Sequence, residues 1–185
     1  MLYHLNMQET TNFQFIGRLP QFEDVLHSVS ALSDNDWVSY RERKNMGGIA
    51  GGQTDTIPLL YGTRDVLSSQ REHSMFAVFS SAVHSICSIY SDRVFPASPA
   101  RAFLARMAPN GEIKRHKDRG DVSAKTHRVH LPIITNNKCL FTVGDETEHL
   151  AAGELWLIDN TDKYHSVING GSEFRVHLIV DLIHV

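Results

Sequence analysis

Several features that would define a class of protein are scarce or missing in this 185-residue sequence. It contains only two cysteines, Cys87 and Cys139, which are too few for a zinc ribbon or a disulfide framework. It has no apolar run approaching the roughly 20 residues of a membrane span, and its first residues lack the basic and apolar segments of a secretory signal. We therefore expect a soluble protein of the reducing cytoplasm, with no membrane partner and with buried thiols.

An excess of positive charge is also missing. Lys and Arg number 18 against 21 Asp and Glu, which gives a formal net charge of −3. Proteins that bind nucleic acid normally carry a basic face, so we expect no nucleic-acid partner. The run GGIAGG lacks the Gly-Lys-Ser/Thr ending of a phosphate-binding loop and the glycine order of a dinucleotide fingerprint, which argues against nucleotide binding. The sequence does not indicate the oligomeric state.

The length fits one domain over residues 1–185, with residues 1–100 as helical and loop support and 101–185 as most of the core. Apolar residues at helical spacing predict an amphipathic helix of about three turns from Phe22. A stronger stripe predicts a second helix from Phe76 to Tyr90. Residues 1–100 should therefore consist of helices and loops that support the core.

A glycine-rich segment between the two predicted helices, residues 45–62, is predicted to be a loop. It is interpreted either as a plain surface loop or as a lid over a substrate pocket. Arg41 and Arg43 precede it and are weak candidates for binding a substrate carboxylate. The role of this loop stays open.

Short β-like segments dominate the chain after Pro99. They are AFLARMAP, HRVHLPII, CLFTVG, ELWLID, YHSVI and FRVHLIVDLI, separated by Asn-Gly, Gly-Asp and Gly-Gly turns. Helices first and strands afterwards predict an α+β fold. Many short strands of this kind roll into a jelly roll, the cupin-like double-stranded β-helix, whose mouth is a natural ligand pocket.

Three residues in this half form a candidate metal site. Side chains alternate faces along a strand, so His116 and Asp118 can point the same way and bind one ion, with Lys117 facing away. His165, far along the chain, would add a second imidazole. Two histidines and one carboxylate on one side of an ion are typical of non-haem Fe(II) oxygenases, which keep the opposite side open for substrates.

Arg175 strengthens this interpretation. In a chain with 11 histidines a His-x-Asp pair arises by chance, but its combination with His165 and then Arg175 is more specific. On a strand next to His165, Arg175 could hold an acid co-substrate through a bidentate, charge-assisted pair. We therefore predict a metal site with a carboxylate anchor beside it.

The arginine belongs to a short repeated pattern. Arg128-Val-His130-Leu and Arg175-Val-His177-Leu place an arginine and a histidine two residues apart, hence on one face of each strand. For His177 we favour a structural, hydrogen-bonded role because Arg175 already supplies the anchor. The role of His130 cannot be read from the pattern alone.

The C-terminal part resembles the aspartyl/asparaginyl β-hydroxylase family of Fe(II)- and 2-oxoglutarate-dependent oxygenases. The resemblance covers roughly residues 102–185, and the ligand spacing is also similar to that of bacterial proline hydroxylases. It is carried by the motifs NGEIKRHKD, RVHLPI, VGDE, GELWLID and YHSVINGGSEFRVHLIVDLIHV. The last motif is the most specific, because it contains the histidine, the Asn-Gly turn, the arginine and the VD-x-x-H ending in one register.

The resemblance implies that His116 and His165 bind iron and that Arg175 pairs with the distal carboxylate of 2-oxoglutarate. It implies further that Arg128 and His130 contact this co-substrate. Animal aspartyl hydroxylases have glycine where this chain has Asp118, and their R-x-H motif lies closer to the first histidine. The full triad is nearer the proline hydroxylase pattern, and whether Asp118 is an essential ligand stays open.

The expected function is that of an Fe(II)- and 2-oxoglutarate-dependent dioxygenase that hydroxylates an amino acid, free or within a peptide or protein. O2 would be the oxidant, with ascorbate as a supporting reductant. The alternative is a cupin-like metal- or ligand-binding module without oxygenase turnover, since jelly rolls have many functions. Arg175 separates the two, because a simple cupin needs no acid anchor there. The substrate cannot be derived from the sequence.

Overall fold

The computed structural model describes residues 11–37, 54–61, 70–118 and 123–185. Within them the chain forms the α-helices α1 (Phe22–Ser30) and α3 (Phe76–Arg93) and the short 3-10 helices η1 (Asp34–Asp36) and η2 (Ser123–Lys125). The strands are β1 (Phe13–Arg18), β2 (Thr54–Tyr61), β3 (Arg71–Glu72), β4 (Ala97–Met107), β5 (Glu112–His116), β6 (Thr126–Ile134), β7 (Cys139–Val143), β8 (Glu146–Glu148), β9 (Glu154–Ile158), β10 (His165–Asn169) and β11 (Arg175–His184).

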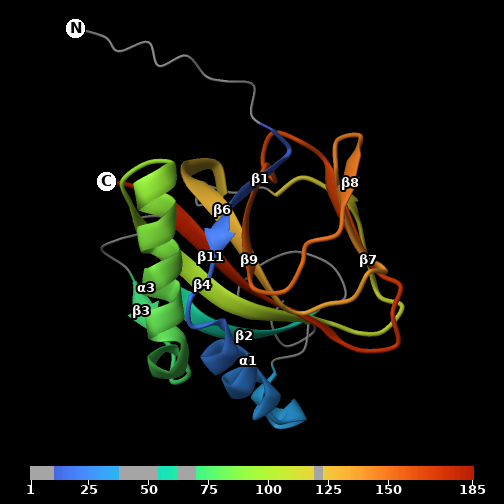
Figure 1. Ribbon diagram of the computed structural model, residues 1–185, viewed down its shortest axis with the longest axis horizontal. Coiled ribbons are helices and arrows are strands. Elements are labelled where there is room, and N and C mark those ends of the chain that lie inside the picture. Colours follow the sequence, from blue (N-terminus) through green and yellow to red (C-terminus); the bar gives the residue numbers. More distant parts are fainter. Residues whose placement is uncertain (1–10, 38–53, 62–69, 119–122) are drawn as a thin grey trace, which may run out of the picture.

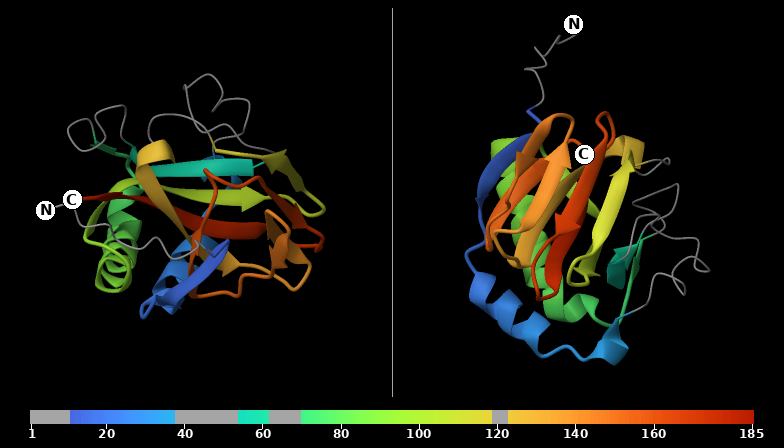
Figure 2. Two further views of the ribbon diagram at one scale, coloured as in Figure 1. Left: turned by 90° about the horizontal axis from the view of Figure 1, so that it is seen from above. Right: turned by 90° about the vertical axis from the view of Figure 1, so that its right-hand side faces the viewer.

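The strands make two antiparallel sheets. The larger sheet has the order β1-β9-β6-β11-β4-β2-β3 and the smaller one the order β5-β10-β7-β8. In the right-hand view of Figure 2 the smaller sheet lies in front, with the larger sheet and the helices behind it. Apolar residues of both sheets, among them Met107 and Ile158 from the larger and Phe141 and Val167 from the smaller, form one buried cluster between them. The sheets therefore pack face to face.

Both helices lie against the larger sheet on the side away from the smaller one (Figure 1). The buried side chains of α3, including Phe79, Val83, Ile86 and Tyr90, recur every three or four residues and form one apolar stripe against the sheet. The helix ends where the Val94 N–H donates to the Tyr90 carbonyl. No helix in the described ranges is both long and apolar enough to cross a lipid bilayer.

The side chains of the central strand β11 reach both faces of the larger sheet. Its residues alternate between faces, as strand geometry requires. Those that join the apolar core beneath the helices are Val176, Leu178, Val180 and Leu182. Those on the opposite face, toward the smaller sheet, are Arg175, His177, Ile179 and Asp181. Polar and charged side chains are thus buried in the space between the sheets, and the helices support them from behind.

Most predicted elements are confirmed. Both predicted helices form, each of the six β-like segments contains a strand, and the fold is α+β. The predicted order of helices first and strands afterwards is wrong, because β1 and β2 precede α3 and join the larger sheet. The sequence did not predict β1, because this strand is irregular. Its register with β9 shifts between Phe15 and Gly17, and this glycine has a φ of 143°. Such a bulge interrupts the alternation that identifies a strand.

The predicted loop over residues 45–62 is wrong for Thr54–Tyr61, which forms β2. Pro58 argues against a strand in sequence, since proline cannot donate to a ladder and is confined to edges and bulges. Here the register between β2 and β4 shifts between Pro58 and Leu60, which accommodates the proline. The rest of that segment, with Arg41 and Arg43, lies outside the described residues.

We predict that Leu178→Ala lowers the free energy of unfolding by about 3 kcal/mol, because Leu178 is fully buried on the central strand and the change leaves a cavity. Leu140→Ala is the control, since Leu140 is 38% exposed on β7 and should cost less than about 1 kcal/mol. Urea denaturation at pH 7 measures both. Equal losses for the two variants would contradict the assignment of the core.

Candidate functional site

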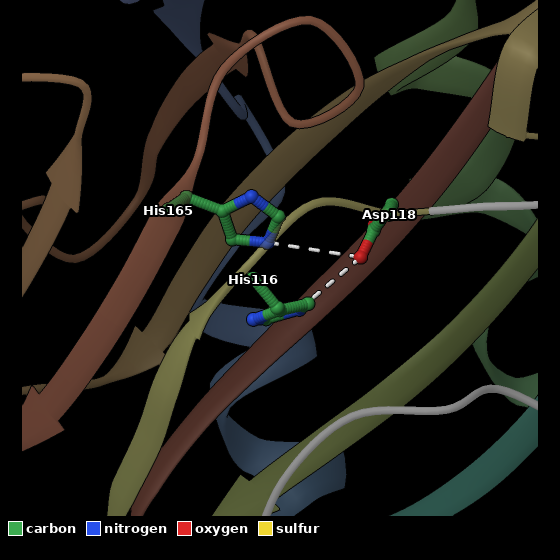
Figure 3. A group of neighbouring side chains, drawn as sticks. All are labelled: His116, Asp118 and His165. Carbon is green, nitrogen blue, oxygen red and sulfur yellow. Dashed lines mark ion pairs between the residues drawn. The ribbon is translucent and has the colours of Figure 1, made fainter.

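Three side chains that could hold one metal ion converge at the edge of the space between the sheets. His116 is the last residue of β5 and His165 the first residue of β10, and the two are paired across these strands. Asp118 follows the end of β5, where its backbone N–H donates to the Asn160 carbonyl. The potential ligand atoms of the triad all lie within 4.8 Å of one another. Figure 3 shows both imidazoles pointing toward the Asp118 carboxylate.

Hydrogen bonds determine which atoms of the three side chains face one another. His116 Nδ1 lies 2.8 Å from the Lys114 carbonyl, which can only accept, so the ring donates there and directs Nε2 toward Asp118. The Nε2 atoms of His116 and His165 lie 3.3 and 3.7 Å from Asp118 Oδ1. Asp118 Oδ2 instead accepts from Asn160 Nδ2 at 2.6 Å and from Arg128 Nη1. One carboxylate oxygen is thus held by the protein and the other faces the imidazoles.

The charges of the triad follow from burial and from these contacts. Burial alone would raise the pKa of Asp118, but the Arg128 charge and the hydrogen bond with His116 outweigh it and hold the pKa far below its usual range. Burial lowers the pKa of His165 to about 4, against the pull of the Asp118 carboxylate, so this imidazole is neutral at pH 7. The hydrogen bond to Asp118 raises the pKa of His116. A metal ion would therefore compete with a proton for His116 Nε2.

Asp181 forms an ion pair with Arg128, the arginine that binds Asp118. It lies on β11 directly between Arg101 on β4 and Arg128 on β6, and it is 1% exposed. Arg128 donates from Nε to Asp181 Oδ1 at 2.7 Å and from Nη2 to Oδ2 at 3.1 Å, and Arg101 Nε donates to Oδ2 at 2.7 Å. Burial would lower the pKa of Arg128, but the Asp181 and Asp118 carboxylates reverse this and raise it. Arg128 is therefore a fixed cation.

Arg175 has a different environment. It is 3% exposed at the start of β11, and among the described residues it has no carboxylate partner. Its Nη2 donates to His177 Nδ1 at 2.9 Å. Burial lowers the pKa of Arg175 to about 10, which still leaves the guanidinium charged at pH 7. A buried cation without an anion is costly, so this position suits an acidic ligand.

One pocket contains the triad, Arg175 and the two residues of the R-x-H motif. Its lining residues are Thr54, Phe103, Ala105, Ile113, His116, Asp118, Arg128, His130, Phe141, Asn160, His165, Val167, Arg175 and Ile179. Phe103, Ala105 and Ile179 form a separate apolar cluster in this lining. The pocket thus combines a polar ligand set, a buried cation and an apolar wall.

The structure brings all six predicted site residues to this one pocket, with two differences in placement. Asp118 lies just beyond the strand that was predicted to carry it. Arg175 was predicted on a strand neighbouring that of His165, but β10 and β11 belong to opposite sheets, so the arginine faces the triad across the pocket. Lys117 points away from the pocket, over the Tyr164 ring.

Sequence reasoning missed Asn160, Asp181 and Arg101. Asp181 carried a usable signal, because an acid within the apolar run RVHLIVDLI is expected to be buried and paired. Asn160 directly follows the recognised motif ELWLID but carries no pattern of its own. His177 is buried and hydrogen-bonded, as predicted.

Solved structures of other proteins share this fold. The structure matches a 2OG-Fe(II) oxygenase family oxidoreductase from Burkholderia pseudomallei with a TM-score of 0.56 at 11% identity, covering 88% of this chain and 89% of that one. It also matches a Pseudomonas putida prolyl-4-hydroxylase with a TM-score of 0.63 at 10% identity, covering 95% and 94% of the two chains. The fold is the double-stranded β-helix of the oxygenases, as predicted.

Sequence comparison identifies the family. The profile described as Aspartyl/Asparaginyl beta-hydroxylase matches residues 64–185, and the chain belongs to this family. The L-proline cis-4-hydroxylase of Rhizobium meliloti is 31% identical over 78 residues, which are 42% of this chain. The match spans 28% of that relative's length, well under two thirds of it.

The buried pairing of Asp181 generates a prediction for stability. Asp181→Asn should lower the free energy of unfolding by about 3 kcal/mol, because it removes the carboxylate that pairs with Arg101 and leaves the buried Arg128 with Asp118 alone. Asp34→Asn is the control, since Asp34 also pairs with an arginine but its side chain is 88% exposed and should contribute under about 1 kcal/mol. Chemical denaturation measures the difference, and a neutral Asp181→Asn would contradict it.

A second prediction concerns pH. Burial, followed by the charge of nearby arginines, holds the pKa of His130 and His177 well below the ordinary value. In the unfolded chain these imidazoles bind protons near pH 6.5, whereas in the folded protein they stay neutral. The free energy of unfolding should therefore fall by up to about 1.4 kcal/mol per pH unit for each histidine as the pH drops below 6.5. His177→Asn should therefore reduce the slope of unfolding free energy between pH 7 and 5 in metal-free protein. Equal slopes for the wild-type protein and His177→Asn would refute the assignment.

Proposed function

We propose that the protein is an Fe(II)- and 2-oxoglutarate-dependent dioxygenase that hydroxylates an amino acid, free or as a residue of a peptide or protein. The single observation that carries this proposal is the presence, in one pocket, of a His-Asp-His triad and of a buried arginine without a carboxylate partner among the described residues. Membership of the hydroxylase family supports it. The R. meliloti relative is named for hydroxylation of L-proline, which favours a small amino acid or peptide residue as substrate.

The donor set fits Fe(II). Two imidazole nitrogens and one carboxylate oxygen form the combination preferred by non-haem Fe(II) centres with open positions. His165 is neutral at pH 7, and His116 Nδ1 donates to the Lys114 carbonyl. Once an ion displaces the proton that His116 Nε2 shares with Asp118, the Nε2 atoms of both rings would bind that ion. Asp118 Oδ1 completes the set while Oδ2 stays with Arg128 and Asn160. These contacts support Asp118 as a ligand that binds through one oxygen.

When bound, Fe(II) would supply the redox chemistry that couples oxidative decarboxylation of 2-oxoglutarate by O2 to hydroxylation of a substrate C–H bond. The chain's own residues provide position and environment. Arg175 would bind the distal carboxylate of 2-oxoglutarate through charge-assisted hydrogen bonds. Because Arg175 and the triad project from opposite sheets, an extended diacid can reach both.

The remaining pocket residues have supporting roles in this proposal. Arg128 fixes Asp118, and with His130 it lines the part of the pocket where the proximal end of the co-substrate would lie. The apolar cluster of Phe103, Ala105 and Ile179 would exclude water beside the reacting C–H bond. Ascorbate would keep the iron reduced. Residues 1–185 would form a single oxygenase domain.

The experiment is succinate release by purified protein incubated with Fe(II), ascorbate and 2-oxoglutarate under air. Slow release is expected without substrate, and faster release with a substrate that gains the mass of one oxygen atom. Candidate substrates are free proline, aspartate, asparagine and peptides that contain them. Absence of both 2-oxoglutarate binding and turnover would contradict the proposal and favour the cupin-like binding module.

Two variants separate the roles of the site residues. His165→Ala should abolish binding of Mn(II), used as a non-reactive substitute for iron, because it removes a ligand. Arg175→Met should retain Mn(II) but weaken 2-oxoglutarate roughly 100-fold, as expected for losing two charge-assisted hydrogen bonds. Titration calorimetry measures both, with Arg18→Met as an exposed control. Loss of the metal in Arg175→Met would refute the proposed role of this arginine.

A further inference from the structure

The two buried arginines of the pocket are held by chemically different partners. Arg128 donates to two carboxylates, those of Asp181 and Asp118, so its charge is neutralised within the protein. Arg175 donates instead to an imidazole, that of His177. This difference decides which of the two guanidinium groups retains an unbalanced charge for an anion.

The geometry determines the state of His177. A guanidinium has no acceptor atom, so His177 Nδ1 must accept the 2.9 Å bond from Arg175 Nη2, and the ring proton resides on Nε2. The ring is 1% exposed, and its burial, together with the Arg175 charge, holds its pKa well below the ordinary value. His177 is therefore a neutral acceptor at pH 7.

A second imidazole supports this arrangement. His130 Nδ1 lies 3.4 Å from His177 Nδ1, a long contact in which only His130 can be the donor. The two rings meet edge to face, with centroids 5.6 Å apart. Because both side chains are buried, the acceptor atom is fixed in front of the guanidinium. Arg175 is thus oriented on one side by neutral groups.

We propose that His177 is a positioning residue for the acid co-substrate: its Nδ1 orients the Arg175 guanidinium without neutralising it, which leaves the full positive charge for a carboxylate. The inference rests on the proposed function, in which Arg175 binds 2-oxoglutarate. An aspartate at this position would orient the arginine equally well but would occupy its charge, as Asp181 does for Arg128. A leucine would fill the space without orienting it.

Three substitutions in the full-length protein test these alternatives. His177→Asn keeps an acceptor close to the position of Nδ1, His177→Leu removes the acceptor, and His177→Asp adds a negative charge. Binding of 2-oxoglutarate to the Mn(II)-loaded protein is measured by calorimetry, and binding of Mn(II) alone is measured in parallel. The exposed His84→Leu on α3 controls for loss of a histidine. Thermal unfolding of each variant verifies that it is folded.

We expect Mn(II) affinity to stay at the wild-type value in all folded variants. The dissociation constant for 2-oxoglutarate should rise roughly 10-fold in His177→Leu, the effect of one hydrogen bond to a charged group, and roughly 100-fold in His177→Asp, with His177→Asn near wild type. In turnover the loss should appear as a higher KM for 2-oxoglutarate with a smaller change in kcat.

Wild-type affinity for 2-oxoglutarate in both His177→Leu and His177→Asp would overturn the inference while the proposed function stands. A weakening in His177→Asn as large as that in His177→Leu, or an equal loss of Mn(II) binding, would assign His177 a purely structural role and overturn it as well. If His177→Leu does not fold, His177→Asp against His177→Asn decides. Failure of the wild-type protein to bind 2-oxoglutarate would instead refute the proposed function.

Discussion

Arg128 connects the parts on which the site depends. It extends from β6 of the larger sheet, where Asp181 fixes it through two nitrogens, and its remaining nitrogen donates to Asp118 beside the smaller sheet. Asp118 lies on no strand, so it needs these contacts and that of Asn160 to keep its position. The triad therefore combines two imidazoles set by strand pairing with one carboxylate set by a buried ion-pair network. Such a network costs desolvation, which an apolar replacement would avoid. We therefore infer that the network serves to position Asp118 and not only to stabilise the fold.

The pocket shows how the same residue type serves two purposes. Arg128 is balanced by acids and acts as a fixed structural cation, whereas Arg175 is held by neutral groups and faces the triad from the opposite sheet. The division follows from β11 itself, whose alternate residues place Arg175, His177 and Asp181 on the pocket face. The alternating residues Val176, Leu178 and Val180 pack in the core beneath α3, so the helix supports the strand from the other face.

Much of this could be predicted from the sequence. The helical stripe of α3 and the alternation in β11 are strong local signals, and the order of His116, Asp118, His165 and Arg175 predicted four residues that the structure brings to one pocket. Local signals failed where the backbone departs from regular structure, as at Gly17 in β1 and Pro58 in β2. They also failed for partnerships across sheets. That Asp181 holds Arg128, or that Arg175 opposes His165 rather than neighbouring it, depends on strand order, which periodicity does not encode.

We propose that Asp118 binds the metal through Oδ1 while Arg128 keeps Oδ2, and that Arg175 binds the far end of the co-substrate. The most direct measurement is a crystal structure of the protein with Mn(II) and 2-oxoglutarate. The account predicts one ion bound by His116, His165 and a single oxygen of Asp118, with the distal carboxylate on Arg175. An ion bound without Asp118 would contradict this proposal. So would a distal carboxylate that displaces Asp181 and binds Arg128.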